Sequence, residues 1–511
     1  MLLALSEQIE KIDRYSSSVL GIPLITLMER SGRAVAGVLR ENVKEGARVV
    51  ILAGGGNNGG DGYALASIIS EEYDCTVFDV FCKGQRSDEG IAFRDKYIKS
   101  GGKLVSRELT SHDLEFIKNS DCIVDAVFGT GFKGAMPKSI SSLIACINSS
   151  TCAYKIAIDV PLGVNADDGS ISESYACSVD VTVALSFIKP GLVCYPARPF
   201  VGRIVYDSLG LPKDRIMSDF SFRFNLIDGE LASSMLPVRE ENGSKGSFGK
   251  LLSVTGSDKY RGAAHLSLEA ALRGGVGLVT YYGTGELCRE LSMKYPEAIY
   301  HKSGEIALSD TDVDRICELS SAHTAVLIGS GSSVTSQLYL LVKKMLKTEG
   351  PPVILDADAI NALAENREEA LLLLKNSPRR VVLTPHPLEF ARLYGTDVAS
   401  VQSKRTTLAI EFAASYNVIL VLKGAGTIVT DGEHVYINST GSSALSKAGS
   451  GDVLAGFLAS VVASGADCLS ASSLSVYYHG LAADALACQL SAYGVTPSDL
   501  PREIARQLAL R

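Results

Sequence analysis

The chain has 511 residues, of which 46% are apolar and 21% charged, and its formal net charge is -8. This length favours two to four domains, each large enough to bury a core. The acidic balance, without a basic block, argues against nucleic acid as a partner, and no apolar run is long enough to cross a membrane. The 11 cysteines form no CxxC pair, which favours reduced thiols in a cytoplasmic protein.

The first 15 residues are too acidic, and their apolar run is too short, for a signal peptide. Their pattern predicts an amphipathic helix with Leu5, Ile9 and Ile12 on one face. That face could pack on its own domain or on a second subunit, and we expect a homo-oligomer.

The first part of the chain alternates apolar, β-branched segments with helical ones. Such segments predict strands that are buried on both faces. Their alternation predicts an α/β domain with a parallel sheet between helical layers. Periodicity is lost over 211–235, so we place a boundary near 220 and expect domains at 1–220 and 221–511. The strands expected in the first domain are 48–53, 75–82, 121–131, 154–163 and 179–187.

A second alternating pattern predicts a second doubly wound α/β domain. Two apolar helices, 452–465 and 472–490, close it. Its strands are expected within 249–257, 276–283, 324–332, 351–363, 379–387, 417–426, 427–432 and 434–440.

The stretch GGGNNGGDG, residues 54–62, lies between an expected strand and a helix. Backbone N–H groups at a helix start favour phosphate, and glycine lets phosphate oxygens approach the backbone. The spacing is neither GxGxxG nor a P-loop. The alternative is a flexible turn in which Asp61 caps the helix.

Two further loops follow strands of the same domain, where ligands of parallel sheets bind. Asp125 precedes the glycine-rich loop 129–134, and Asp159 precedes a sharp turn at 161–163. A carboxylate and Lys133 at this edge could move a proton. Alternatively, Asp159 caps its own turn and Lys133 is a solvated loop charge.

In the second domain, GSGD at 449–452 opens an apolar helix. This arrangement predicts an anion hole for a transferring phosphoryl group, with Asp452 as the base that takes a hydroxyl proton. Lys423 follows a strand and suits a nucleotide's phosphates, which would also carry a divalent ion. The alternatives are an N-cap role for Asp452, a surface charge for Lys423, and a core or capping role for His386, which lies between two prolines.

The motifs GGGNNGGDG, DAVFGTGFKG and AIDVPLG resemble the epimerase domain of NAD(P)H-hydrate repair enzymes, over roughly 1–210. That family interconverts the R and S forms of hydrated NADH and NADPH. The resemblance implies a Rossmann-like three-layer sandwich, with Asp159 as acid/base, Lys133 assisting, and Asn58 and Asp125 binding K+. Leu162 replaces a serine that usually helps to hold the ion. The implied ligand-binding residues, besides Asp159, are Asn57, Asn58, Gly59, Gly60, Asp61, Gly129, Thr130, Gly131, Phe132, Lys133, Gly134 and Ala135.

The motifs GSGSS, LDADAINAL, TPHPLEFARL, LKGAGTIV and GSGDVLAG resemble the ribokinase-like NAD(P)H-hydrate dehydratase domain, over about 222–511. In bacterial members, that domain uses ADP to remove water from the S epimer. The resemblance implies ADP and Mg2+ here, with Asp452 as base. Ser330 and Leu388 stand where the family often has proline and glycine. The implied nucleotide-binding residues are Lys423, Gly424, Ala425, Gly426, Thr427 and Gly451, and Ala263, Gly331, His386 and Asp452 would contact the hydrated dinucleotide.

Together the two resemblances imply a bifunctional isomerase and lyase that returns hydrated NADH and NADPH to the reduced form, with AMP and phosphate as products. One alternative is a ribokinase-like small-molecule kinase with an accessory nucleotide-binding domain. Another is a non-catalytic nucleotide-binding scaffold. Because Asp159 and Asp452 are both present, the sequence favours an enzyme.

Overall fold

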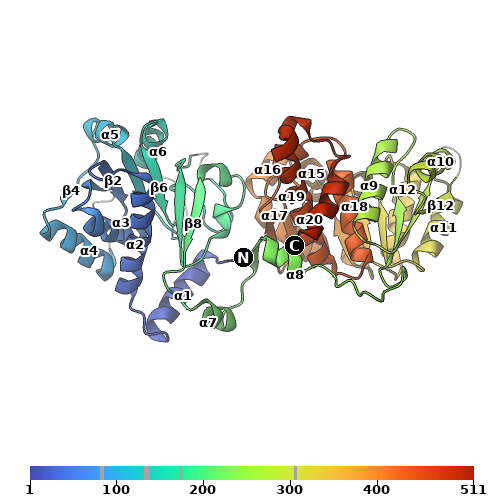
Figure 1. Ribbon diagram of the computed structural model, residues 1–511, viewed down its shortest axis with the longest axis horizontal. Coiled ribbons are helices and arrows are strands. Elements are labelled where there is room, and N and C mark those ends of the chain that lie inside the picture. Colours follow the sequence, from blue (N-terminus) through green and yellow to red (C-terminus); the bar gives the residue numbers. More distant parts are fainter. Residues whose placement is uncertain (81–85, 132–137, 172–174, 304–307, 511) are drawn as a thin grey trace. The chain divides into compact units, whose positions relative to one another are not determined.

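A computed structural model describes residues 1–80, 86–131, 138–171, 175–303 and 308–510. The chain forms two compact units that divide between Phe224 and Asn225 (Figure 1). Within the described ranges, no helix combines the length and the apolar character that a membrane span requires.

The first unit is a three-layer α/β structure. Its sheet has the order β4-β3-β2-β5-β6-β7-β8, and all its described pairings are parallel, as expected. The elements are β1 (Leu2–Leu3), α1 (Ser6–Ser18), α2 (Leu24–Asn42), β2 (Arg48–Ala53), α3 (Asn57–Ile69), β3 (Asp74–Asp79), α4 (Asp88–Lys99), β4 (Lys103–Val105), α5 (Ser111–Lys118), β5 (Cys122–Ala126), α6 (Lys138–Ser149), β6 (Tyr154–Ile158), β7 (Val181–Leu185), the 3-10 helices η2 (Pro190–Leu192) and η3 (Arg198–Phe200), β8 (Arg203–Asp207) and α7 (Lys213–Asp219).

Alternate residues of β2 fill two separate cores, because successive side chains of a strand point to opposite faces. Val49 and Ile51 pack with α1, α2 and α3 on one face. Val50 and Leu52 pack with α5 and α6 on the other. Ile9 and Ile12 belong to the first of these cores, so the apolar face of α1 packs within its own unit.

The second unit is also α/β, with a mixed sheet. Starting at β9, the order is β9-β18-β17-β16-β15-β14-β13-β10-β11-β12; β16 to β12 are parallel, whereas β17 is antiparallel to both neighbours. The elements are β9 (Phe224–Ile227), α8 (Gly229–Ser234), β10 (Lys250–Val254), α9 (Arg261–Arg273), β11 (Leu278–Gly283), α10 (Gly285–Lys294), β12 (Ile299–Lys302), α11 (Asp310–Ser320), β13 (Ala325–Ile328), α12 (Ser336–Lys347), β14 (Val353–Leu355), α13 (Asp358–Glu365), α14 (Arg367–Lys375), β15 (Val381–Leu383), α15 (Pro387–Tyr394), α16 (Val398–Ser403), α17 (Arg405–Tyr416), β16 (Ile419–Leu422), β17 (Ile428–Thr430), β18 (Val435–Asn438), the 3-10 helix η4 (Ser443–Leu445), α18 (Ser450–Ala463), α19 (Cys468–Gly494) and α20 (Leu500–Ala509).

Two capping alternatives from the sequence are wrong. α3 begins at Asn57 with Gly56 as its N-cap, so Asp61 lies inside the helix. α18 begins at Ser450 with Gly449 as its N-cap, so Asp452 lies in the first turn of the helix. Both carboxylates are therefore free of the N-cap role.

The glycines after β2 let the loop that follows β2 pack directly against the backbone at the end of β5. The amide of Gly54 donates to the carbonyl of Ala126 at 3.0 Å. A Cβ at Gly54 would lie 1.8 Å from the carbonyl oxygen of Val127, and one at Gly59 would lie 2.0 Å from that of Gly54. The crowding of glycine in this turn thus has a packing reason.

We predict that Gly59→Ala destabilises the first unit by about 1–3 kcal/mol, because its methyl group meets backbone that cannot rotate away. Gly56→Ala is the matched control, since no atom lies within 4 Å of the added Cβ. Scanning calorimetry of both variants measures the effect. Equal melting temperatures for Gly59→Ala and Gly56→Ala would contradict this packing argument.

Candidate functional site

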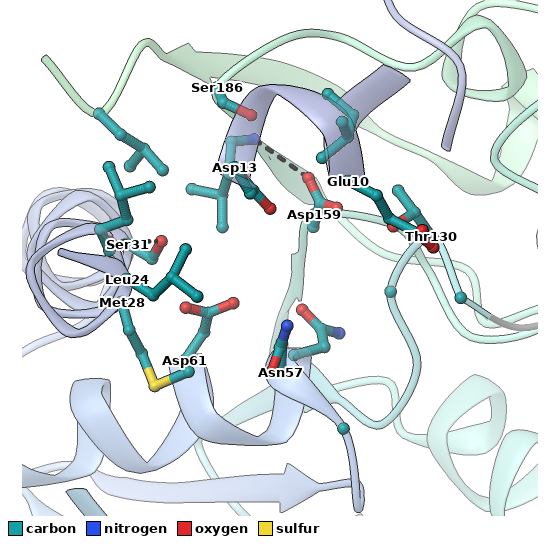
Figure 2. A pocket seen from close by; sticks show the side chains of 18 of the residues that line it. Glu10, Asp13, Leu24, Met28, Ser31, Asn57, Asp61, Thr130, Asp159 and Ser186 are labelled. Carbon is teal, nitrogen blue, oxygen red and sulfur yellow. Dashed lines mark hydrogen bonds between the residues drawn. The ribbon is translucent and has the colours of Figure 1, made fainter. Parts of the chain in front are cut away.

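A cavity of about 500 Å³ lies in the first unit, beside the loops that follow β2, β5, β6 and β7 and against α1 and α2 (Figure 2). The predicted residues that line it are Asn57, Asn58, Asp61, Gly129, Thr130, Gly131 and Asp159. Gly59 and Gly60 instead face the backbone of Gly54 and the side chain of Met28. The predicted residues Phe132, Lys133, Gly134 and Ala135 lie outside the described part of the chain.

Asp159 and Lys189, which both line this cavity, form a buried ion pair. Asp159 follows β6 directly, and its φ of +67° is a left-handed conformation that aspartate tolerates better than most residues. One carboxylate oxygen accepts from the ammonium of Lys189 and from the amide of Leu185 at 3.2 Å. Lys189 also donates to the carbonyl of Leu185 at 2.8 Å, and its side chain is 1% exposed. A fixed cation thus holds the Asp159 carboxylate in place in the cavity.

Two more carboxyl groups, of Asp13 and Asp61, face the same space as Asp159 (Figure 2). The pKa of Asp13 is raised to about 6, chiefly by burial; the charge of Lys189 opposes this shift, and those of Asp159 and Glu10 add to it. Burial also raises the pKa of Asp61 well above its ordinary value, with Asp159 adding to the effect. The cavity therefore combines an ion-paired carboxylate with two carboxyl groups whose pKa values are raised.

The expected potassium ligands lie beside this cavity. Asp125 accepts from the amides of Val127 at 3.2 Å and Leu162 at 2.6 Å, and burial raises its pKa to about 6. Asn58 donates to the carbonyl of Phe128 at 2.8 Å, whereas its Oδ1 is buried and has no hydrogen-bond partner among the described residues. An oxygen in this state is a suitable ligand for a cation.

The second unit contains a cluster of polar side chains around Asp356, which follows β14. Its Oδ1 accepts from Lys423 at 2.9 Å and from Thr384 at 2.6 Å, and its Oδ2 accepts from Ser330 at 2.8 Å. Although burial alone would lower the pKa of Lys423, the charges of Asp356 and Glu389 hold it above its ordinary value. Lys423 is therefore a permanent cation at the strand ends, rather than the surface charge that the sequence left as an alternative.

Asp452 shares this electrostatic environment from the first turn of α18. A Cβ at Gly451 would lie 3.3 Å from the ammonium of Lys423, which places that cation against the N-terminus of the helix. The pKa of Asp452 is raised to about 7, chiefly by burial and then by the charge of Asp356, while Lys423 opposes the shift. A carboxyl group that titrates near neutrality is suited to proton transfer.

Ala263 lies in the first turn of α9, and Gly331 and the residues 424–427 lie in loops with positive backbone φ at their glycines. Gly331, at a φ of +63°, leaves no room for a side chain, since a Cβ there would lie 2.5 Å from the Cβ of Ala263. Gly424 and Gly426 have positive φ, and Thr427 donates to the carbonyl of Gly424 at 2.9 Å. The loop 424–427, which includes Ala425, thus follows Lys423 directly.

His386 has the capping role that the sequence left as an alternative. Its Nδ1 accepts from the amides of Leu388 at 3.1 Å and Glu389 at 3.2 Å at the start of α15. Its side chain is 47% exposed, so the ring can both cap and contact a ligand. Leu388 is exposed, and so it does not fill this turn with a buried side chain.

Sequence reasoning missed three groups at these sites. Lys189 follows β7 within SFIKPG, and Asp13 follows an amphipathic repeat within IEKID. Asp356 stands in LDADAINAL, which was noted as a motif without a role for this carboxylate. The available signal was a charged residue directly after an apolar strand or on an apolar helix face.

Two classes of fold are now defined. The strand order of the first unit is that of a Rossmann-like sheet with β8 added at one edge. The second unit has the ribokinase-like fold: a ribokinase-like superfamily protein from Enterococcus faecalis is 22% identical, with a TM-score of 0.50 over 57% of this chain and 97% of that one.

Comparisons with known sequences identify the family. A model described as NAD(P)H-hydrate dehydratase matches residues 251–506, and one described as YjeF-related protein N-terminus matches residues 24–191. The bifunctional NAD(P)H-hydrate repair enzyme Nnr of Moorella thermoacetica is 35% identical over 98% of this chain and 95% of its own length. The enzyme of the same name from Escherichia coli is 31% identical over 97% and 92%. The chain belongs to the family of bifunctional NAD(P)H-hydrate repair enzymes.

We predict that Asp452→Asn stabilises the second unit at alkaline pH. The pKa of Asp452 is raised in the folded protein from 3.8 to about 7, so its contribution to stability is present below about pH 4 and lost as the pH rises through 7. Asparagine carries no charge to desolvate. The gain should be on the order of 2 kcal/mol at pH 8 and smaller at pH 5.

Calorimetric melting at the two pH values measures this gain. Asp314→Asn is the control, because the Asp314 side chain is 63% exposed. The stability difference between Asp452→Asn and the unsubstituted protein should be larger at pH 8 than at pH 5. An equal difference at both pH values would contradict the raised pKa of Asp452.

Proposed function

We propose that this chain repairs hydrated NADH and NADPH: the first unit interconverts their R and S epimers, and the second dehydrates the S epimer at the expense of ADP. The observation that carries the proposal is the pair of acid sites, Asp159 with Lys189 and Asp452 with Lys423, in a chain of this family. The two activities form one route, since an epimerase converts the form that the dehydratase rejects.

The substrate's chemistry explains what each acid must do. Protonation of the more electron-rich enamine of a dihydronicotinamide leaves an iminium carbon beside the ring nitrogen, and water adds there. The product carries a hydroxyl on a carbon that is bonded to nitrogen. Removing the hydroxyl proton opens the ring to an aldehyde, and closure on the opposite face gives the other epimer. In the first unit, Asp159 takes that proton.

The second unit converts the hydroxyl into a better leaving group. Asp452 takes its proton while the oxygen attacks the β-phosphorus of ADP, which gives a phosphate ester and AMP. The ring nitrogen then expels phosphate, and loss of a proton from the neighbouring carbon restores the double bond. Lys423 and the amides at the start of α18 stabilise the charge on the transferring group.

Mg2+ would reach this site on the nucleotide. No group of three or more His, Cys, Asp or Glu side chains arranged to hold a metal ion occurs among the described residues. A divalent ion bound chiefly through phosphates needs only one or two protein ligands, and it would neutralise the oxygens of the transferring group. Asp356 and Asp452 are the carboxylates that we propose as protein ligands of this ion.

We predict that purified protein restores the near-ultraviolet absorbance of NADH from either epimer when ADP and Mg2+ are present. Asp452→Asn should abolish recovery from both epimers, whereas Asp159→Asn should slow recovery only from the R epimer, down to its spontaneous rate. Recovery from separated epimers, followed by absorbance and chromatography, measures this division. Asp314→Asn should behave like the unsubstituted protein.

Two results would contradict this division of labour. If Asp159→Asn and Asp452→Asn each affect recovery from the R and S epimers equally, the first unit is not a separate epimerase. A phosphorylated product that persists, with no reduced nicotinamide recovered, would favour the small-molecule kinase instead.

A potassium ion is the second cofactor that we propose. The buried Oδ1 of Asn58 without a partner supports it, and Asp125 retains lone pairs beyond its two amide contacts. Leu162, in place of the usual serine, offers its amide to Asp125 but no side-chain oxygen, so the ion would have fewer side-chain ligands here.

We predict that replacing Na+ by K+ raises the epimerisation rate several-fold and leaves dehydration of the S epimer unchanged. Asn58→Ala should remove the dependence on K+, whereas Asn119→Ala, on the exposed end of α5, should retain it. Initial rates at constant ionic strength measure the effect. Equal rates in the two salts would exclude a functional potassium site.

A further inference from the structure

The charges that line the cavity of the first unit do not balance. Among its described lining residues, Lys189 is the single cation, and it already binds Asp159 and the carbonyl of Leu185. The carboxyl groups that line the same cavity are those of Glu10, Asp13, Asp61, Glu89 and Asp159. Carboxylates that share a partly buried cavity disfavour one another's ionisation, and a bound pyrophosphate would add further negative charge. This imbalance favours the retention of a proton in the cavity.

Asp61 is the carboxyl group best placed to retain that proton. It lies on α3 and faces Asp13 of α1 and Asp159 after β6 (Figure 2). Burial and the charges of Asp159 and Asp13 raise its pKa well above the ordinary value, while Lys189 and a hydrogen bond with Ser31 oppose the shift only in part. The base and the proton-bearing group therefore lie in one cavity, on different elements.

This arrangement matches a need of the reaction that Asp159 alone does not meet. When the hydroxyl loses its proton and the ring opens, the carbon–nitrogen bond breaks and its electron pair goes to the ring nitrogen. That nitrogen must then gain a proton, and it must lose it again when the ring closes on the other face. Because each proton returns to its donor, the cycle needs no external reagent.

We propose that Asp61 is the general acid of the epimerase site, giving its proton to the ring nitrogen while Asp159 takes the hydroxyl proton, and that Asp13 is a positioning residue that keeps Asp61 protonated. The inference rests on the proposed epimerase function. It gives Asp61 a catalytic role, whereas the resemblance to the family assigns Asp61 only to ligand binding.

The pH dependence of epimerisation separates this role from simple binding. An acid must be protonated to act, so the rate should fall as the pH rises through the pKa of Asp61. Asp13→Asn removes a negative charge that raises this pKa, so the fall should move to lower pH. The charged groups that line the cavity with Asp61 are Glu10, Asp13, Glu89, Asp159 and Lys189, and of these Asp13, Asp159 and Lys189 act on its pKa.

The experiment uses full-length protein and the separated R epimer, with kcat and KM measured across pH. We expect Asp61→Asn to lower kcat about 100-fold, within the range for loss of a general acid. Asp13→Asn should keep most of kcat at low pH, and the fall of kcat at alkaline pH should move to lower pH. Glu7→Gln, which removes a carboxylate 74% exposed on the same helix as Asp13, should change neither. Dehydration of the S epimer by the same preparations checks that the second unit is intact, and calorimetry checks the first.

The outcomes distinguish the two claims. If the unsubstituted protein epimerises and Asp159→Asn does not, but Asp61→Asn keeps its kcat and raises only KM, Asp61 is a binding contact and the inference is wrong. If kcat of Asp13→Asn falls at the same pH as kcat of the unsubstituted protein, the role proposed for Asp13 is wrong. If the unsubstituted protein does not epimerise at all, the proposed function of this unit fails, and the inference with it.

Discussion

Each unit of this protein holds a buried ammonium against a carboxylate at the carboxyl ends of its parallel strands. Lys189 binds Asp159 in the first unit, and Lys423 binds Asp356 in the second. Such charges are costly to remove from water and persist only where further hydrogen bonds satisfy them. The amide of Leu185 and the hydroxyls of Ser330 and Thr384 supply those bonds. The remaining site chemistry follows from these two pairs.

The pairs set the protonation of the groups around them. Asp159 is paired with Lys189, while burial raises the pKa values of Asp13 and Asp61, which share the cavity. In the second unit, Lys423 is engaged mainly by Asp356, so it only partly offsets the burial of Asp452. Each site thus combines an ion-paired carboxylate with at least one carboxyl group whose pKa is raised.

Much of this organisation could be predicted from the sequence. Two α/β units were predictable because buried parallel strands read as continuous apolar runs, as in β2 and β5. The strand-end aspartates Asp125 and Asp159 were predictable for the same reason. Short edge strands were missed: β4 has three residues, and β12 contains a histidine and a lysine, so neither has the apolar run of a central strand.

What the sequence could not supply was the pairing of distant charges. Asp159 and Lys189 are separated by 30 residues, and Asp356 and Lys423 by 67, and only the sheet order brings them together. Lys133, which the resemblance gave as assisting Asp159, lies outside the described residues. The lysine that binds Asp159 in the described structure is Lys189, which follows β7, the neighbour of β6.

The most direct test of the account follows the oxygen of the added water. The S epimer, labelled with ¹⁸O in its hydroxyl group, is converted by the full-length protein with ADP and Mg2+, and the products are analysed by mass spectrometry. The account predicts that the label leaves in inorganic phosphate, because Asp452 activates that hydroxyl to attack phosphorus. Label recovered in water, with none in phosphate, would contradict it.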